Sequence, residues 1–155
     1  FKNAIPLDER KDLLSAYNKR LFSGSPVDQA RFSKIWTKWE NSLASFYNLG
    51  SSPTPSAEYA KAFARIENHY FMNLGFLGEN DQIFKHLDKI MEIPITIVQG
   101  RYDMICPPYI AYDLHKKLPA SKLIMVDKAG HAMSEPGISS ALVQATDEIK
   151  LSRLT

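Results

Sequence analysis

The sequence predicts an α/β protein in which a helical segment, residues 1–90, precedes strands and helices of a parallel sheet, residues 91–155. Three observations support this prediction. Apolar residues recur at helical spacing before Met91, they form short continuous runs after it, and a stretch of helical periodicity lies between the two runs and another follows them. Alternating strands and helices are typical of a parallel sheet that is covered by helices.

The first ninety residues predict amphipathic helices separated by turn residues. Ser25 and Ser56 each precede a helical pattern and have the side chain that N-cap positions prefer. Gly24 ends the first pattern, and the run Gly50–Pro55 predicts a loop. The predicted helices span residues 8–22, 26–47, 57–74 and 82–90. Their apolar stripes include Phe32, Ile35, Trp36, Trp39, Leu43, Phe46 and Tyr47 in the second helix and Tyr59, Phe63, Ile66, Tyr70, Phe71 and Leu74 in the third.

After Met91 the sequence predicts strands at 95–98 and 123–126, with helices at 108–118 and 138–151. Continuous apolar runs favour strands that are buried on both faces of a sheet. Two strands leave unpaired edges, so we expect them to join further strands from an upstream part of the same sheet.

Composition excludes several functions. A formal charge of +2, with Lys and Arg spread along the chain, predicts no nucleic-acid partner. No apolar run reaches the length of about 18 residues that a membrane span needs, and a single cysteine forms no internal disulfide. The chain starts at Phe1 without a signal-peptide pattern, so we expect a cytoplasmic protein whose front part is missing.

An acid and a histidine follow the two predicted strands. Asp103 lies three residues after Gly100, and His131 follows 28 residues later in the string Ala-Gly-His. Both therefore lie at the carboxyl ends of strands, where α/β folds place their chemistry. The order and context match the late part of an α/β-hydrolase core and predict two members of a catalytic triad. Alternatively, Asp103 is a turn or N-cap residue before Pro107, and His131 belongs to a structural turn.

The third member of such a triad is absent. No Gly-x-Ser-x-Gly string occurs between Phe1 and Thr155. Because the nucleophile precedes the acid in this fold, we expect it upstream of the chain. Without a nucleophile and an oxyanion loop, the isolated chain is expected to be inactive.

Two glutamates stand within the apolar stripes of predicted helices. Glu40 follows Trp36 by one turn, and Glu67 occupies the corresponding place in the third helix. A carboxylate in such a place costs several kcal/mol unless it is paired or protonated. Its partner is either a neighbouring cation, Arg65 or Lys38, or the cationic group of a ligand, such as a free α-amino group.

Several strings resemble one known family, proline iminopeptidase, also called prolyl aminopeptidase. The resemblance runs in order along almost the whole chain, beginning with residues 5–21. It is carried by WTKWE at 36–40, ARIENHYF at 64–71, VQGRYDMICP at 98–107, AGH at 129–131 and SEPGI at 134–138.

The resemblance implies a serine exopeptidase that releases N-terminal proline from peptides. It also implies a C-terminal part of an α/β-hydrolase core, residues 91–155, preceded by a helical cap domain, residues 1–90. Matched string by string, Asp103 is the triad acid and His131 the triad base. Glu40 and Glu67 match the cap carboxylates that hold the amino group of the substrate.

Other residues near these strings have weaker assignments. Tyr70 and Phe71 are candidates to pack on the pyrrolidine ring of the substrate. Cys106 shares the loop of Asp103 and predicts sensitivity to thiol reagents, but no base is placed to make it a nucleophile. We expect no cofactor and no metal, because no metal-ligand spacing is present among His69, His86 and His115.

Three functional hypotheses remain open from the sequence. The first is the C-terminal part of a proline iminopeptidase, with a proline-terminated peptide and the missing part of the core as partners. The second is a short protein that binds amine-terminated peptides without cleaving them. The third is an α/β-hydrolase esterase of other specificity, for which the charges of Glu40 and Glu67 would have no use.

Overall fold

The computed structural model describes residues 1–47, 54–78 and 82–152. They form two compact units, one of residues 1–41 and 54–78, the other of residues 42–47 and 82–152. The sequence placed the change of character near Met91, but the structure assigns residues 82–90 and the segment 42–47 to the unit that contains the strands. Helical periodicity ends near residue 90, whereas membership of a unit follows tertiary packing, in which Leu87 is buried.

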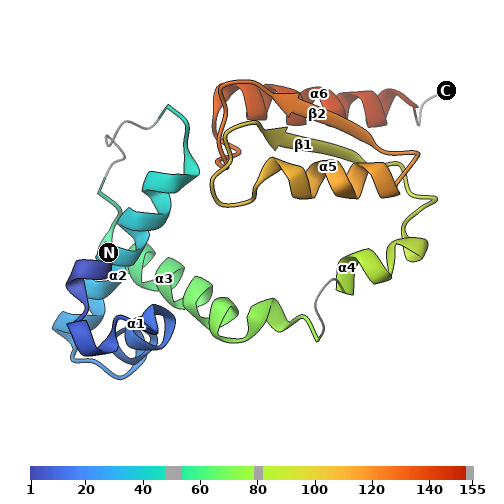
Figure 1. Ribbon diagram of the computed structural model, residues 1–155. Coiled ribbons are helices and arrows are strands. Elements are labelled where there is room, and N and C mark those ends of the chain that lie inside the picture. The colour runs from blue at the N-terminus through green and yellow to red at the C-terminus, as the bar shows by residue number, and fades with distance from the viewer. Residues whose placement is uncertain (48–53, 79–81, 153–155) are drawn as a thin grey trace. The chain divides into compact units, whose positions relative to one another are not determined.

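The first unit is helical (Figure 1). Its elements are η1 (Lys2–Ala4), η2 (Leu7–Glu9), α1 (Leu13–Phe22), α2 (Pro26–Ala44), α3 (Ala57–Met72) and η3 (Leu74–Phe76), and the last residues of α2 count with the second unit. Most of the predicted loop at 50–55 lies outside the described residues. None of the helices in the described part of the chain is long and apolar enough to cross a membrane.

Polar caps set where these helices begin. The predicted caps are confirmed, since Ser25 Oγ accepts from Asp28 N and Ser56 Oγ from Tyr59 N, both at 3.1 Å. The predicted start of the first helix at residue 8 is wrong. Asp12 accepts from the backbone N–H of Ser15, so α1 begins at Leu13.

Aromatic rings from several elements build the core of the first unit. Tyr17 is fully buried, with its ring stacked on Phe1 at 4.4 Å between centroids and edge-on to Trp36 at 5.4 Å. Burial raises the pKa of Tyr17 to about 12, so the phenol keeps its proton and donates to the backbone oxygen of Phe1. The buried cluster comprises Ile5, Ala16, Tyr17, Leu21, Phe32, Trp36 and Ala64.

Helix α3 buries a different face from the one that its aromatic residues predict. Ala60, Ala64 and Asn68 are buried, whereas Tyr59, Ile66, Tyr70, Phe71 and Leu74 are exposed. Small side chains let α3 approach α1 closely. The amide of Asn68 then bonds to the backbone oxygen of Leu14 at 3.1 Å and to the side chain of Asn18 at 2.7 Å. The predicted stripe is therefore wrong for most of its residues, and only Phe63 packs against the core as predicted.

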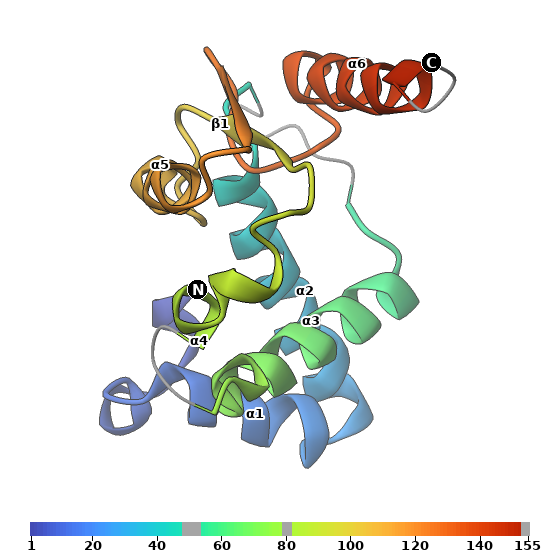
Figure 2. The ribbon, with the colours of Figure 1, turned by 90° about the vertical axis from the view of Figure 1, so that its right-hand side faces the viewer.

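The second unit contains the predicted parallel strands. Its elements are α4 (Gln82–Lys85), η4 (Leu87–Lys89), β1 (Thr96–Gly100), α5 (Pro108–Lys117), β2 (Lys122–Val126) and α6 (Pro136–Ser152). The strands pair in parallel from Thr96 opposite Lys122 to Gly100 opposite Val126. Helices α5 and α6 lie on opposite faces of the sheet in both views (Figures 1 and 2).

The strands are less buried than their apolar runs predict. Residues 96–99 of β1 are half-buried, and only Gly100 is buried. Within the described residues the sheet has two strands, so each strand has one neighbour and one open edge. The strands and helices of this unit are those that the sequence predicts. The two strands alone, however, do not form a sheet that is buried on both faces.

Candidate active site

Asp103 lies in the loop that follows β1. Its Oδ1 accepts from the backbone N–H groups of Ile105 at 2.9 Å and Cys106 at 2.8 Å. The turn role considered from the sequence is therefore real. The carboxylate is only 6% exposed, and these two bonds fix its orientation so that Oδ2 remains available for another partner.

The loop that follows β2 carries His131 and is bound at two places. Tyr102 N donates to the oxygen of Ala129 at 2.9 Å. This bond connects the loop after β1, which carries Asp103, to the loop after β2, called the histidine loop below. His131 N and Ala132 N both donate to the oxygen of Ala44, at 2.8 and 2.7 Å. That carbonyl ends α2, where helix oxygens lack partners inside the helix. The last turn of α2 therefore holds the backbone of the histidine.

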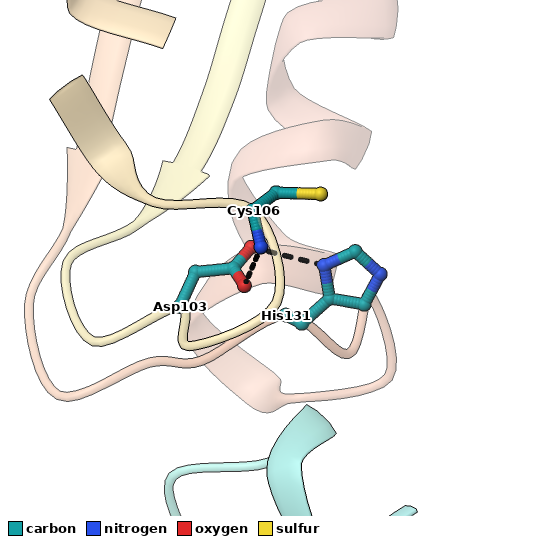
Figure 3. Close-up of side chains that lie close together, drawn as sticks. All are labelled: Asp103, Cys106 and His131. Carbon is teal, nitrogen blue, oxygen red and sulfur yellow. Dashed lines mark hydrogen bonds and ion pairs between the residues drawn. The ribbon is translucent and has the colours of Figure 1, made fainter. Parts of the chain in front are cut away.

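The structure brings the predicted acid and histidine together. His131 Nδ1 lies 3.0 Å from Asp103 Oδ2 (Figure 3). A carboxylate at this nitrogen favours the tautomer with its proton on Nδ1, which leaves Nε2 as the basic atom. Figure 3 shows this second nitrogen directed away from Asp103, and the imidazole is 41% exposed. The pair can therefore take a proton from a group outside it.

Glu135 supports the histidine loop and was not singled out as a site residue from the sequence. It is 5% exposed, and its carboxylate accepts from Ser45 Oγ at 2.6 Å and from the backbone N–H groups of Gly130, Phe46 and Tyr47. Burial alone would raise the pKa of Glu135, but these hydrogen bonds lower it below its usual range. In the sequence, Glu135 was marked only by its place before Pro136 in the string SEPGI, which carries part of the resemblance to proline iminopeptidases.

Gly100 marks the closest approach of β1 to the histidine loop. A Cβ at this position would lie 2.0 Å from the oxygen of Gly130 and 2.7 Å from that of Ala129. We expect Gly100→Ala to displace this loop and to lower the free energy of unfolding of the second unit by about 3 kcal/mol. Urea unfolding followed by circular dichroism measures the loss, and the His131 ring resonances report the displaced loop.

A second glycine provides the control for this substitution. A Cβ at Gly137 would meet Val126 Cγ1 at 2.7 Å, which is a side-chain methyl group and not backbone. Gly137→Ala should therefore cost about 1 kcal/mol and leave the His131 resonances in place. Equal losses for the two variants would show that the backbone contact at Gly100 has no special role.

Cys106 lies beside the acid and the histidine. Its Sγ, a carboxylate oxygen of Asp103 and a ring nitrogen of His131 lie within 4.8 Å of one another. Burial, and then the charge of Asp103, raise the pKa of the Cys106 thiol. The thiol therefore stays protonated near neutral pH. The sequence indicated no base near Cys106, whereas the structure places His131 beside it.

The two predicted amine-binding glutamates lie in the first unit and are half-buried. Glu67 Oε2 accepts from Trp36 Nε1 at 2.8 Å, and Glu40 lies one turn after Trp36 on α2. Arg65, considered as a partner for these carboxylates, has other acceptors. It donates to the oxygen of Leu21 and to the side chain of Gln29.

The candidate proline-contacting aromatics lie on the open face of α3. Tyr70 is 51% and Phe71 43% exposed. Tyr70 lies edge-on to Phe76 at 5.3 Å, and the ring of Phe71 lies 6.1 Å from that of Trp36. Both rings therefore keep surface available within this unit.

Comparison with known proteins identifies the fold family. The sequence pattern of the α/β-hydrolase fold family matches residues 5–137. The chain belongs to this family. The α/β-hydrolase assignment agrees with the positions of Asp103 and His131, which follow successive parallel strands of the described sheet.

The resemblance of this α/β-hydrolase chain to proline iminopeptidases is confirmed. It is 48% identical over 145 residues to a protein of Leptolyngbya boryana named as a probable proline iminopeptidase, covering 92% of this chain and 45% of the relative. The proline iminopeptidase of Arabidopsis thaliana is 44% identical over 97% of this chain and 40% of the relative. That of Xanthomonas citri is 43% identical over 95% and 48%. The chain thus spans less than half the length of these relatives.

Proposed function

We propose that this chain supplies the acid and the base of a serine-type proline iminopeptidase, which releases N-terminal proline from peptides. The pair of Asp103 and His131, 3.0 Å apart at the ends of adjacent parallel strands, carries the proposal. The similarity to proteins named proline iminopeptidase supports the choice of substrate.

In this mechanism His131 Nε2 takes the proton of a serine hydroxyl as the hydroxyl attacks the peptide carbonyl. Asp103 stabilises the resulting imidazolium, which then gives the proton to the leaving amine. The serine and the oxyanion donors belong to polypeptide outside these 155 residues, because the chain has no Gly-x-Ser-x-Gly string. The greater length of the relatives supports this placement.

Selection for a free amino terminus rests on Glu40 and Glu67 in this proposal. Two carboxylates would pair with a cationic terminus, whereas an internal peptide bond offers no charge to them. The exposed rings of Tyr70 and Phe71 provide apolar surface for a pyrrolidine ring.

The complete reading frame that contains these residues provides the test. We expect it to encode a Gly-x-Ser-x-Gly turn, and the expressed protein to release arylamine from prolyl arylamide but not from its N-acetylated form. Glu40→Gln and Glu67→Gln should each lower kcat/KM about 10²-fold, because a buried cation loses a charged partner. The 155-residue chain alone should show no turnover.

Glu58→Gln is the matched control, because Glu58 is an exposed residue in the first turn of α3. Unchanged kcat/KM in the Glu40 and Glu67 variants, with hydrolysis of simple esters, would assign the protein to another specificity among α/β-hydrolases. A reading frame without a nucleophile, together with binding of proline-terminated peptides to the chain, would identify a non-catalytic binder instead.

A further inference from the structure

Three potential metal ligands meet at the strand ends of the second unit. A carboxylate oxygen of Asp103, Sγ of Cys106 and a ring nitrogen of His131 all lie within 4.8 Å of one another (Figure 3). Cys106 and His131 are exposed, so a hydrated ion can reach them from solvent. The sequence predicted no metal site from the spacing of His69, His86 and His115, and that prediction did not consider the three residues of this cluster.

Two of the three ligands lie about 0.3 Å closer together, as a hydrogen-bonded pair, than zinc would hold them. Zinc bound tetrahedrally to imidazole nitrogen and carboxylate oxygen, each about 2.0–2.1 Å away, holds these atoms about 3.3 Å apart. The separation of His131 Nδ1 and Asp103 Oδ2 is 3.0 Å. Cys106 is exposed, so its side chain can rotate to bring the sulfur closer.

The surroundings of Asp103 fix this ligand in advance. Backbone N–H groups of Ile105 and Cys106 hold Oδ1, and Gln99 Nε2 lies 3.3 Å from Oδ2. Hydrogen bonds of this kind orient carboxylate ligands in metal sites. One of these hydrogen bonds comes from the backbone N–H of Cys106. The loop therefore positions two of the proposed ligands, Asp103 and Cys106, together.

The mixture of donors selects the ion. Thiolate, imidazole and carboxylate together favour a borderline-soft divalent ion, and three protein ligands with an open fourth position form a common zinc arrangement. We propose that Zn²⁺ binds to Asp103, Cys106 and His131 and thereby blocks the pair that the proposed mechanism uses. On binding, the Cys106 thiol releases its proton to solvent, and the proton on His131 Nδ1 is replaced by one taken up from solvent at Nε2. The freed lone pairs of the sulfur and of Nδ1 then form the bonds to zinc. The site is thus inhibitory, and its existence does not depend on peptidase activity.

Cobalt(II) provides a direct probe of the site in the 155-residue chain. Because the sequence has a single cysteine, any thiolate-to-cobalt charge-transfer band in the ultraviolet must come from Cys106. We expect this band to appear on titration with Co²⁺ and to disappear when Zn²⁺ is added. Cys106→Ser should abolish it, and His131→Ala should weaken Co²⁺ binding at least about 10-fold, as the loss of a ligand does.

His86→Gln is the control, because His86 is exposed and lies outside the cluster. Its cobalt titration should match that of the unchanged chain. The proposal is overturned if no charge-transfer band appears at excess Co²⁺. It is also overturned if the band persists with unchanged affinity in His131→Ala, since the thiol would then bind the ion without the histidine. Failure of the complete protein to cleave proline substrates would leave these spectra unaffected.

Discussion

We expect Asp103→Asn to lower kcat for proline release by the complete enzyme about 10⁴-fold, with KM little changed. The reason lies in how the loop holds this side chain. Its Oδ1 accepts two backbone N–H bonds, so an asparagine would keep its oxygen there and present its NH₂ group to His131. The imidazole would then accept at Nδ1 and carry its proton on Nε2, and it could not act as the base.

Steady-state kinetics on prolyl arylamide measure this effect. His131→Ala should cause a similar loss, and the double variant should be no worse than the more damaged single variant, because the two residues act as a unit. Asp127→Asn is the control: Asp127 is exposed, lies in the loop after β2 and pairs with Arg101. If Asp103→Asn retained activity within about tenfold of the parent, the triad role of Asp103 would be rejected.

The second large effect is expected at Glu135. Glu135→Gln should lower the free energy of unfolding of the second unit by about 3 kcal/mol, because hydrogen bonds to a charged acceptor are lost and an NH₂ group faces backbone donors. Three of those donors belong to Ser45, Phe46 and Tyr47. They lie 88 to 90 residues before Glu135 in the sequence but in the same unit of the structure. The fourth is the N–H of Gly130, next to His131.

The pH dependence of unfolding provides an independent check on Glu135. Its pKa in the folded state is lower than the ordinary value of 4.5. The carboxylate therefore contributes its full stabilisation above pH 4.5, and this contribution is lost as the pH falls through the folded pKa. Glu135→Gln should remove that part of the acid dependence.

Glu148→Gln is the matched control for this variant. Glu148 is an exposed glutamate that pairs with Lys122 on the surface of the same unit, so its loss should change the urea midpoint little. The same midpoint for Glu135→Gln and the unchanged chain, with identical acid profiles, would contradict the structural role of Glu135.

The sequence predicted those features that depend on local chemistry. Ser25 and Ser56 cap helices because a hydroxyl before a helical pattern satisfies a free backbone N–H wherever it occurs. Asp103 and His131 were predicted together because parallel strands present their carboxyl ends at one edge of a sheet. The first relation is local, and the second follows from the general geometry of two consecutive parallel strands.

Features that depend on distant partners could not be predicted in the same way. The buried face of α3 is set by the fit of Ala60 and Ala64 against neighbouring helices, whereas hydrophobicity alone favours the aromatic face. The predicted end of the second helix at residue 47 is wrong, since α2 ends at Ala44. The next backbone groups bind Glu135, about ninety residues further along the chain.

The open edges of the sheet affect how samples of this chain must be handled. Along the outer side of β1 and of β2, backbone N–H and C=O groups have no strand partner within the described residues. Such an edge accepts any extended segment of suitable length, including the same strand of another molecule. Concentrated samples are therefore prone to self-association. Light scattering should check that the chain is monomeric before each titration or kinetic experiment. A fusion that provides an adjoining strand would cover one of the two edges and reduce this self-association.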